Sequence, residues 1–202
     1  MKKFKLRNIM KNFKFENILP LKKGNATIIK ENNNHNLYLD DILLMSYNEK
    51  TKLQAKQLYS HYQLAKGDVL CSGLGLGIRE NWLIKKEEVE SVTVVEKSKD
   101  VIDIFSNKNQ ISIINEDIYN YKGKCDVLLL DHYIHPPNDL NNIKKILKNI
   151  ECKIVWWWGI EELLKNGDIM QNYLKLKMEI PQLPNLDKDT VVTFVRNYFN
   201  LK

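Results

Sequence analysis

Glycine occupies every second position of one short stretch, at Gly73, Gly75 and Gly77. An apolar run at residues 69–71 precedes this stretch, and we predict a helix that begins near Ile78. Glycine tolerates positive φ angles and lets backbone N–H groups approach a ligand closely, and a helix N-terminus offers unpaired N–H donors. Gly77 stands one residue before the third glycine of the dinucleotide fingerprint, so the spacing favours a nucleoside-binding turn over a pyrophosphate-binding one. A tight strand-to-helix connection without a ligand would use the same glycines.

Acidic residues follow three further apolar runs, each of which we predict to be a strand. Glu96, Asp117 and Asp131 follow the runs at residues 92–95, 111–114 and 126–130. Glu96 lies roughly 20 residues beyond the glycines, where a ribose-binding carboxylate is expected in a βαβ unit. The carboxyl ends of parallel strands meet at one edge of a sheet, and ligands bind in the crevice there. A single acid of this kind is commonly a helix cap, but three together with the glycine turn favour a binding site.

Composition and charge bound the class of protein. The chain has 202 residues, which is enough for one moderate domain with an appendage. Cys71, Cys125 and Cys152 are odd in number and widely spaced, so we interpret them as small buried residues without a metal or disulfide. No apolar run approaches the length of a membrane span, and the start has no signal-peptide pattern, so we expect a cytoplasmic protein without a membrane partner.

The net charge of +6 comes mainly from lysines spread along the chain, with a basic cluster within residues 1–14. Such a cluster attracts nucleic acid or acidic partners, but it is equally typical of a solvated tail. We favour the solvated tail and do not expect nucleic acid as a partner.

The remaining chain supplies the elements that must position these residues. A hairpin is expected from the runs at 26–29 and 37–39 around an asparagine-rich turn. Expected helices lie within 48–64 and at 78–83, 99–106, 160–164 and from residue 138 or 139 to 147. Further strands are expected at 153–158, 175–180 and 190–195, the last two as a terminal antiparallel pair.

In this order the motifs resemble the class I S-adenosylmethionine-dependent methyltransferase fold, and within it the spermidine synthase-like branch, from residue 37 to about residue 158. The resemblance implies an α/β, Rossmann-like, doubly wound and mostly parallel sheet of about seven strands with a small N-terminal β-hairpin extension. It also implies a division into a basic segment with the hairpin, residues 1–47, and an S-adenosylmethionine-binding domain, residues 48–202.

The resemblance also implies roles for single residues in binding S-adenosyl-L-methionine. The glycines would line its methionine and ribose parts, Glu96 would bind both ribose hydroxyls, and Asp117 would accept from the adenine amino group. Asp131 would face the reacting centre. The full set of expected cofactor contacts is Gly73, Gly75, Gly77, Glu96, Lys97, Asp117, Ile118 and Asp131.

Departures from the family pattern separate two activities. Aminopropyltransferases of this branch have an aspartate where Leu76 stands, and Leu44, Leu53 and Ile134 replace a glutamine, a tyrosine and an aspartate of their active site. A polyamine needs several carboxylates around its ammonium groups, which leucine cannot supply. Many methyltransferases also have an acid two residues before the first glycine, where Cys71 stands in this chain. The contacts to the methionine end of the cofactor therefore differ from that pattern.

Residues after the fourth predicted strand are the candidates for chemistry. Asp131 or His132 would accept a proton, while Tyr133 and one or more of Trp156 to Trp158 would form an aromatic wall for a planar or cationic acceptor. The opposite interpretation is a loop cap at Asp131, exposed histidines and tryptophans in the core. The Asp/Asn-Pro-Pro-aromatic tetrapeptide of amino methyltransferases is absent, which disfavours DNA adenine or protein glutamine as acceptor.

We therefore expect a methyltransferase that acts on an unidentified small-molecule or peptide acceptor. The alternatives are an aminopropyltransferase that uses the decarboxylated cofactor, a non-catalytic nucleoside-binding homologue and, least favoured, a nicotinamide-dependent oxidoreductase. A homodimer is compatible with the sequence.

Overall fold

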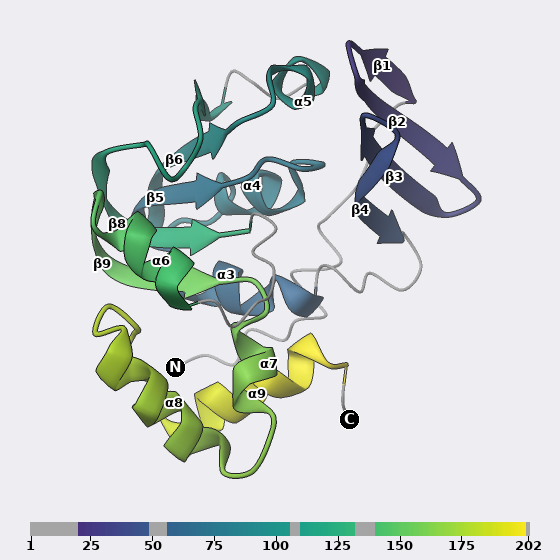
Figure 1. The fold of residues 1–202 in the computed structure, drawn as a ribbon. Helices are drawn as coiled ribbons and strands as arrows, with labels where there is room; N and C mark the ends of the chain where they lie inside the picture. Colours follow the sequence, from purple (N-terminus) through teal and green to yellow (C-terminus); the bar gives the residue numbers. More distant parts are fainter. Residues whose placement is uncertain (1–19, 49–55, 106–109, 132–139, 201–202) are drawn as a thin grey trace.

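The computed structural model describes residues 20–48, 56–105, 110–131 and 140–200. These residues form a parallel five-stranded sheet with helices around it and a separate four-stranded antiparallel sheet (Figure 1). The α/β class with a small N-terminal antiparallel extension is confirmed. In the described part of the chain, no helix combines the length and the apolar character that crossing a membrane requires.

The parallel sheet has the strand order β7-β6-β5-β8-β9. Its first strand, β5, lies at the centre, and the later strands are added first on one side and then on the other. β5 pairs with β6 on one side and with β8 on the other, so its carboxyl end lies where the winding direction reverses. This is the doubly wound, Rossmann-like order. The strands are β5 (Gly67–Ser72), β6 (Val89–Glu96), β7 (Ser112–Asn115), β8 (Gly123–Leu130) and β9 (Ile150–Trp157).

Helices connect and flank these strands, and two short ones have the predicted bounds, residues 78–83 and 160–164. In Figure 1 α6 lies in front of β8 and β9, whereas α7, α8 and α9 form a group at one side of the sheet. The helices are α3 (Tyr59–Leu64), α4 (Ile78–Leu83), α5 (Lys99–Ile104), α6 (Leu140–Leu147), α7 (Ile160–Leu164), α8 (Ile169–Glu179) and α9 (Lys188–Tyr198).

The prediction of a terminal antiparallel pair of strands is wrong. Residues 175–180 and 190–195 belong to α8 and α9, so the described parallel sheet has five strands instead of about seven. In α9 the buried Val191, Phe194, Val195 and Tyr198 recur at spacings of three and four, which is the helical period. Asp187 caps this helix by accepting a hydrogen bond from the Thr190 amide at 2.7 Å.

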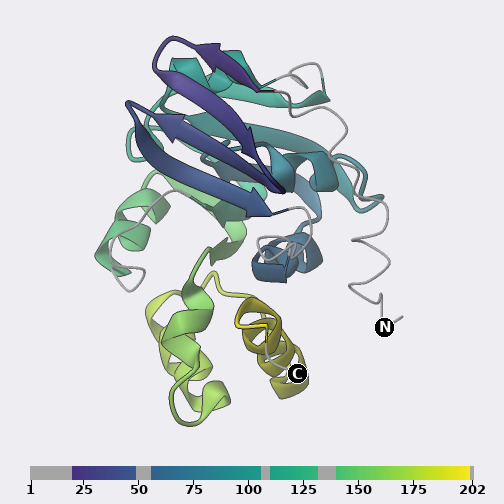
Figure 2. The same ribbon diagram turned by 90° about the vertical axis from the view of Figure 1, so that its right-hand side faces the viewer.

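The predicted N-terminal hairpin is confirmed as β2 and β3, and it belongs to a larger sheet in the order β1-β2-β3-β4. Figure 2 shows this small sheet beside the parallel one, and the Asn25 amide donates to Asp100 of α5 at 2.9 Å. The division proposed after residue 47 falls within β4. The strands are β1 (Leu21–Lys23), β2 (Ala26–Glu31), β3 (Asn34–Leu39) and β4 (Ile42–Asn48).

A buried acid joins the helical group to the parallel sheet. Glu161 of α7 is only 1% exposed, and its Oε1 accepts hydrogen bonds from Ser60 Oγ of α3 at 2.7 Å and from Trp156 Nε1 of β9 at 3.3 Å. Burial raises the pKa of Glu161 from its ordinary 4.5 to about 7, although the bond from Ser60 opposes this shift. About half of the Glu161 carboxyl groups are therefore protonated at neutral pH in the folded chain.

We predict that Glu161→Gln changes how stability depends on pH. Between about 4.5 and about 7 the unfolded chain releases the Glu161 proton while the folded chain keeps it, so this residue lowers stability as pH rises. The glutamine oxygen can still accept both hydrogen bonds, so the variant should gain on the order of 2 to 3 kcal/mol over wild type between pH 4.5 and pH 8. Guanidinium unfolding across this range measures the difference.

The matched control is Glu151→Gln, because Glu151 is exposed and pairs with Lys124 on the surface. The gain with rising pH should be larger in Glu161→Gln than in this surface variant. An equal dependence on pH in the two variants would contradict the raised pKa of Glu161.

Candidate functional site

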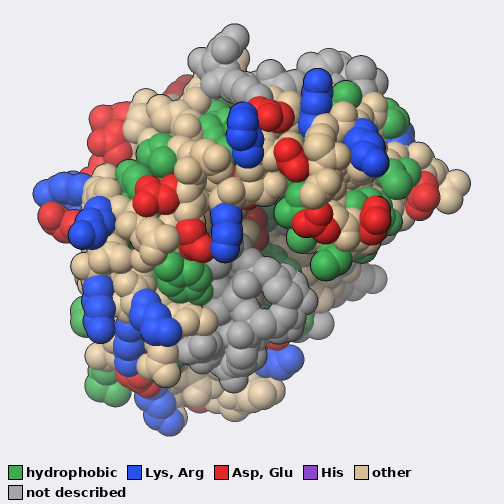
Figure 3. All heavy atoms as spheres, turned by 45° about the horizontal axis from the view of Figure 1, so that its top comes forward, with side chains coloured by type: hydrophobic (Ala, Val, Ile, Leu, Met, Phe, Trp, Pro, Cys, Tyr) green, Lys and Arg blue, Asp and Glu red, His purple; other side chains and the backbone are tan. Residues whose placement is uncertain are grey.

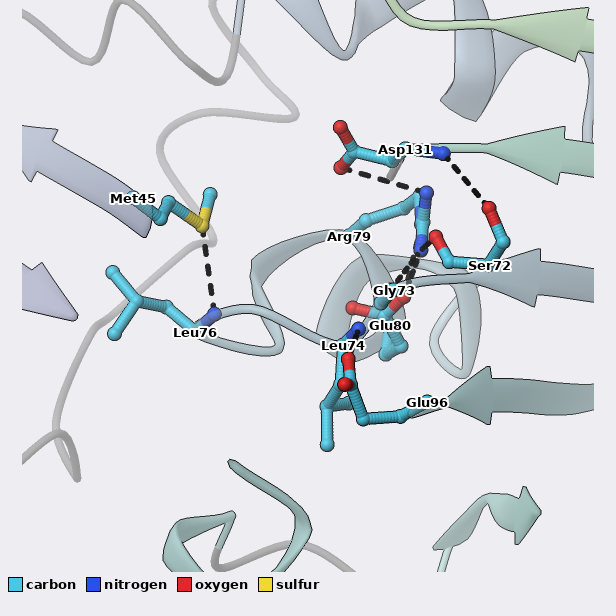
Figure 4. Close-up of polar contacts among 9 residues, drawn as sticks. All are labelled: Met45, Ser72, Gly73, Leu74, Leu76, Arg79, Glu80, Glu96 and Asp131. Atoms are coloured by element: carbon cyan, nitrogen blue, oxygen red, sulfur yellow. Dashed lines mark hydrogen bonds and ion pairs between the residues drawn. The ribbon is translucent and has the colours of Figure 1, made fainter. Parts of the chain in front are cut away.

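The candidate site lies at the carboxyl edge of the parallel sheet, where β5 turns into α4 (Figure 4). Gly73, Gly75 and Gly77 all have positive φ angles there, of 74°, 51° and 68°. The structure therefore has the strand, turn and helix that the glycine spacing predicts. L-residues with side chains rarely adopt these angles, so the path of the turn depends on glycine.

Space as well as backbone angle excludes side chains from this turn. A Cβ atom on Gly77 would lie 2.0 Å from Cε2 of Phe105, and one on Gly75 would lie 2.9 Å from Sδ of Met45. Met45 comes from β4 of the small sheet, and the Leu76 amide donates to its sulfur at 3.5 Å. The small sheet thus contacts the turn directly.

Glu96, at the carboxyl end of β6, ties the glycine turn to the neighbouring strand. Its Oε2 accepts from the Leu74 amide at 2.8 Å and its Oε1 from the Ser98 amide at 2.7 Å. The Gly73 amide donates to the Val95 carbonyl at 3.0 Å. The acid and the turn that the sequence places at one edge are therefore in direct contact.

Asp117 lies beyond β7, in front of the same edge, and forms an ion pair with Lys97. The Lys97 Nζ atom is 3.0 Å from Asp117 Oδ2, and Oδ1 accepts from the Tyr119 amide at 3.1 Å. The Lys97 side chain is 78% exposed, so this pair lies at the surface. Ile118 is buried in the core.

Asp131 follows β8 on the other side of β5. Its amide donates to both the carbonyl and the hydroxyl oxygen of Ser72, at 3.2 Å each, and its Oδ2 lies 3.5 Å from Nη1 of Arg79. Burial raises the pKa of Asp131 to about 6, with Arg79 acting against this shift and Glu80 adding to it. The carboxyl group thus titrates near the range where a general base is useful.

The sequence reasoning missed Arg79 and Glu80, the second and third residues of α4. Both side chains are buried, and the Arg79 Nη2 atom donates to Glu80 Oε1 at 2.6 Å and to the Gly73 carbonyl at 2.7 Å. Adjacent charged residues in a short helix usually face solvent, so the pair gave no signal by itself. The hint lay in their place directly after the glycines.

Cys71 is fully buried, and burial raises the pKa of its thiol to about 12. The interpretation of Cys71 as a small buried residue is consistent with this placement. Among the described residues, no three His, Cys, Asp or Glu side chains are placed to hold a metal ion.

The prediction that tryptophans form an aromatic wall for the acceptor is wrong for Trp156 and Trp157. Trp156 and Trp157 have no exposed surface, and Trp156 packs edge-to-face on Phe194 with ring centroids 5.4 Å apart. Alternate side chains of a strand point to opposite faces, but helices cover both faces of β9, so both rings are in the core. Trp158 is half-buried against Tyr198. His132 and Tyr133 lie outside the described residues.

Comparison with known proteins identifies structural likeness only. No protein-family model matches the chain, and no curated protein matches its sequence. A Thermoplasma acidophilum protein superposes with 20% identity and a TM-score of 0.40, over 54% of this chain and 58% of that one. Spermidine synthase of Thermotoga maritima superposes with 18% identity and a TM-score of 0.42, over 55% and 47%.

Magnesium protoporphyrin IX methyltransferase of Synechocystis, solved with bound SAM, superposes with 16% identity and a TM-score of 0.37, over 50% of this chain and 54% of that one. The chain thus spans about half the length of these structures. These TM-scores and identities are too low to indicate an activity. The Rossmann-like class is assigned from the strand order.

We predict that Gly77→Ala destabilises the fold more than Gly167→Ala. Both glycines have positive φ, but nothing lies within 4 Å of a Cβ on Gly167, whereas a Cβ on Gly77 meets Phe105. The left-handed backbone should cost about 1 kcal/mol in each variant, and crowding should add about 1 to 3 kcal/mol in Gly77→Ala. Urea unfolding of both variants checks this, and equal losses would show that the turn has room that the structure does not.

Proposed function

We propose that this chain is a transferase that binds S-adenosyl-L-methionine and passes its methyl group to an unidentified small-molecule or peptide acceptor. The observation that carries the proposal is the position of the Glu96 carboxylate, which is hydrogen-bonded to the glycine turn. This turn follows β5, on either side of which the order of the strands runs in opposite directions. Nucleoside ligands of open α/β sheets bind in the crevice at this point.

The Glu96 carboxylate fits the ribose of such a cofactor. Each of its oxygens accepts one amide hydrogen bond in the structure, whereas a carboxylate offers about four acceptor sites in total. The two remaining sites match the two adjacent ribose hydroxyls. The glycine turn beside it lets backbone amides approach the ligand without interference from side chains.

Asp117 fits the adenine amino group as an acceptor. Its ion pair with Lys97 is exposed, and exposed pairs contribute little to stability, so a ligand can displace Lys97 at small cost. Ile118 behind it would contribute its amide and the apolar packing of the core. Glu96, Lys97, Asp117 and Ile118 thus form the proposed nucleoside contacts, together with the three glycines.

Asp131 is the proposed group for proton transfer. S-adenosylmethionine supplies an electrophilic methyl group on a good leaving group, so catalysis needs alignment and, for an acceptor with a proton, a base. With a pKa of about 6, the carboxyl of Asp131 is largely ionised at neutral pH and can hold the acceptor's proton. His132 and Tyr133, next in the chain, remain candidate contacts for the acceptor.

An aminopropyltransferase is the second candidate, and the small antiparallel sheet beside the parallel one is the observation that favours it. The residues at the turn act against it. Leu76 is 4% exposed and contributes an apolar side chain where that branch has an aspartate, and Leu44 is half exposed without a polar group. A chain that binds the cofactor without turnover is the third.

The distribution of charge supports a small acceptor over nucleic acid. Lysines of β8, α6 and β9 pair with acids, as Lys124 does with Glu151 at 2.7 Å and Lys144 with Glu179 at 3.0 Å. Figure 3 shows basic and acidic side chains interspersed on one face of the molecule. A nucleic-acid surface would favour one continuous sign. We also propose a cytoplasmic location, with a homodimer as one state to test.

We predict that the purified chain binds S-adenosylmethionine in calorimetric titration and that Glu96→Gln weakens this binding by about 10- to 100-fold. The expected loss corresponds to a charge-assisted hydrogen bond or two, each worth about 1.5 to 3 kcal/mol. The decarboxylated cofactor and NAD, titrated in the same way, should bind more weakly than the carboxylated cofactor.

Glu90→Gln is the matched control, because Glu90 lies on the same strand with an exposed side chain and should leave affinity unchanged. Stronger binding of the decarboxylated form would favour the aminopropyl alternative. Absence of binding by every nucleoside would refute the proposed cofactor site.

A further inference from the structure

The buried guanidinium of Arg79 links the glycine turn to Asp131. Its Nε and Nη2 atoms donate to Glu80, and Nη2 also donates to the carbonyls of Ser72 and Gly73, at 3.2 Å and 2.7 Å. Nη1 has no hydrogen-bond partner among the described residues and lies 3.5 Å from Asp131 Oδ2 (Figure 4). The group with spare donor capacity thus faces the acid at the sheet edge.

Exposure separates the three charged members of this cluster. Arg79 and Glu80 are 3% and 1% exposed, whereas the Asp131 side chain is 26% exposed. Arg79 and Glu80 cancel each other's charge within the core, since they are in contact at 2.6 Å. The charge that a ligand meets at this point is therefore the charge of Asp131.

Three other titratable groups packed around the cluster are neutral at ordinary pH. Burial lowers the pKa of His61 of α3 far below its usual value, with Arg79 adding to the shift. Burial raises the pKa of the Cys71 thiol of β5 to about 12 and that of the Tyr198 hydroxyl of α9 well above its usual value. Between pH 5 and pH 8 these three groups keep their charge. Among the described residues near the cluster, the carboxyl groups that titrate in this range are Asp131, with a pKa of about 6, and the more distant Glu161, with a pKa of about 7.

We propose that Arg79 is a positioning residue that holds Asp131 as the anionic partner of a cationic ligand group beside the glycine turn. This inference rests on the proposed function, under which the cationic group is the sulfonium of S-adenosylmethionine. An ionised carboxylate attracts a sulfonium but not the neutral thioether of S-adenosylhomocysteine. Arg79 keeps the carboxylate in place because its guanidinium is anchored on the backbone of the turn itself.

The consequence is a pH-dependent preference between two ligands that differ by one methyl group and one charge. Asp131, with a pKa of about 6, is mostly protonated at pH 5 and mostly ionised at pH 7.5. The ratio of the S-adenosylmethionine affinity to the S-adenosylhomocysteine affinity should therefore rise about five- to tenfold from pH 5 to pH 7.5. Contacts shared by both ligands cancel in this ratio.

Calorimetric titration of the full chain with both ligands at these two pH values is the test. In Asp131→Asn the ratio should become independent of pH, and in Arg79→Lys the rise should fall to less than about twofold, because lysine cannot bridge the turn carbonyls and Asp131 together. Arg196→Lys and Asp189→Asn are the matched controls, since both residues are exposed on α9, and should keep the wild-type ratio. If the role of Arg79 is purely structural, its substitution should weaken the binding of both ligands equally, and the affinity ratio should depend on pH as in wild type.

Arg79→Lys leaves Glu80 with a poorer partner and could fail to fold. The double variant Arg79→Met with Glu80→Leu removes both buried charges together and should lose the pH-dependent ratio in the same way. Carboxyl carbon NMR of the unliganded wild type gives an independent readout, in which the resonance missing from Asp131→Asn should titrate near pH 6.

The outcomes separate this inference from the proposed function. If both ligands bind wild type but their affinity ratio is the same at both pH values, the inference fails and the nucleoside site stands. If the ratio changes with pH equally in wild type and in the Arg79 variants, the role of Arg79 is refuted. If neither ligand binds wild type, the proposed function fails, and the inference fails with it.

Discussion

The turn after β5 is the constraint on which the rest of the site depends. Its three glycines hold positive φ angles, and the space beside two of them is filled by Phe105, which follows α5, and by Met45 from the small sheet. Close packing of this kind leaves no room for a methyl group, so backbone, core and small sheet fix one another. The turn runs between Glu96 and Asp131, so the two proposed ligand contacts lie on either side of it.

Electrostatics at the site follow from burial more than from the number of charges. Arg79 and Glu80 are removed from water, a loss of hydration that is offset by their mutual contact, by the hydrogen bonds to the turn carbonyls and by the ion pair of Arg79 with Asp131. A buried ion pair often adds little to the stability of the fold. The hydrogen bonds of Arg79 to the carbonyls of Ser72 and Gly73 do, however, fix the backbone at the end of β5. Asp131, which is 26% exposed, lies next to this buried pair and contacts Arg79.

The sequence predicted the elements whose signals are local. The alternation of apolar strands, the glycine spacing and the acids at strand ends led to the correct strand-turn-helix unit and to a parallel sheet. The helix α9 was predicted as a strand because Thr190, Val191 and Val192 form a β-branched run, whereas its buried Val191, Phe194 and Tyr198 have helical spacing. The ion pair of Arg79 with Asp131 could not be predicted, since the two residues lie more than 50 positions apart in the chain and meet only when β8 pairs with β5.

A crystal structure of the chain with S-adenosylhomocysteine would test the central claim most directly. We predict that both ribose hydroxyls lie within hydrogen-bond distance of the Glu96 carboxylate, that the adenine lies beside Asp117, and that the sulfur lies between the glycine turn and Asp131. A nucleoside bound elsewhere, or bound at the turn with Glu96 still engaged only by backbone amides, would contradict it.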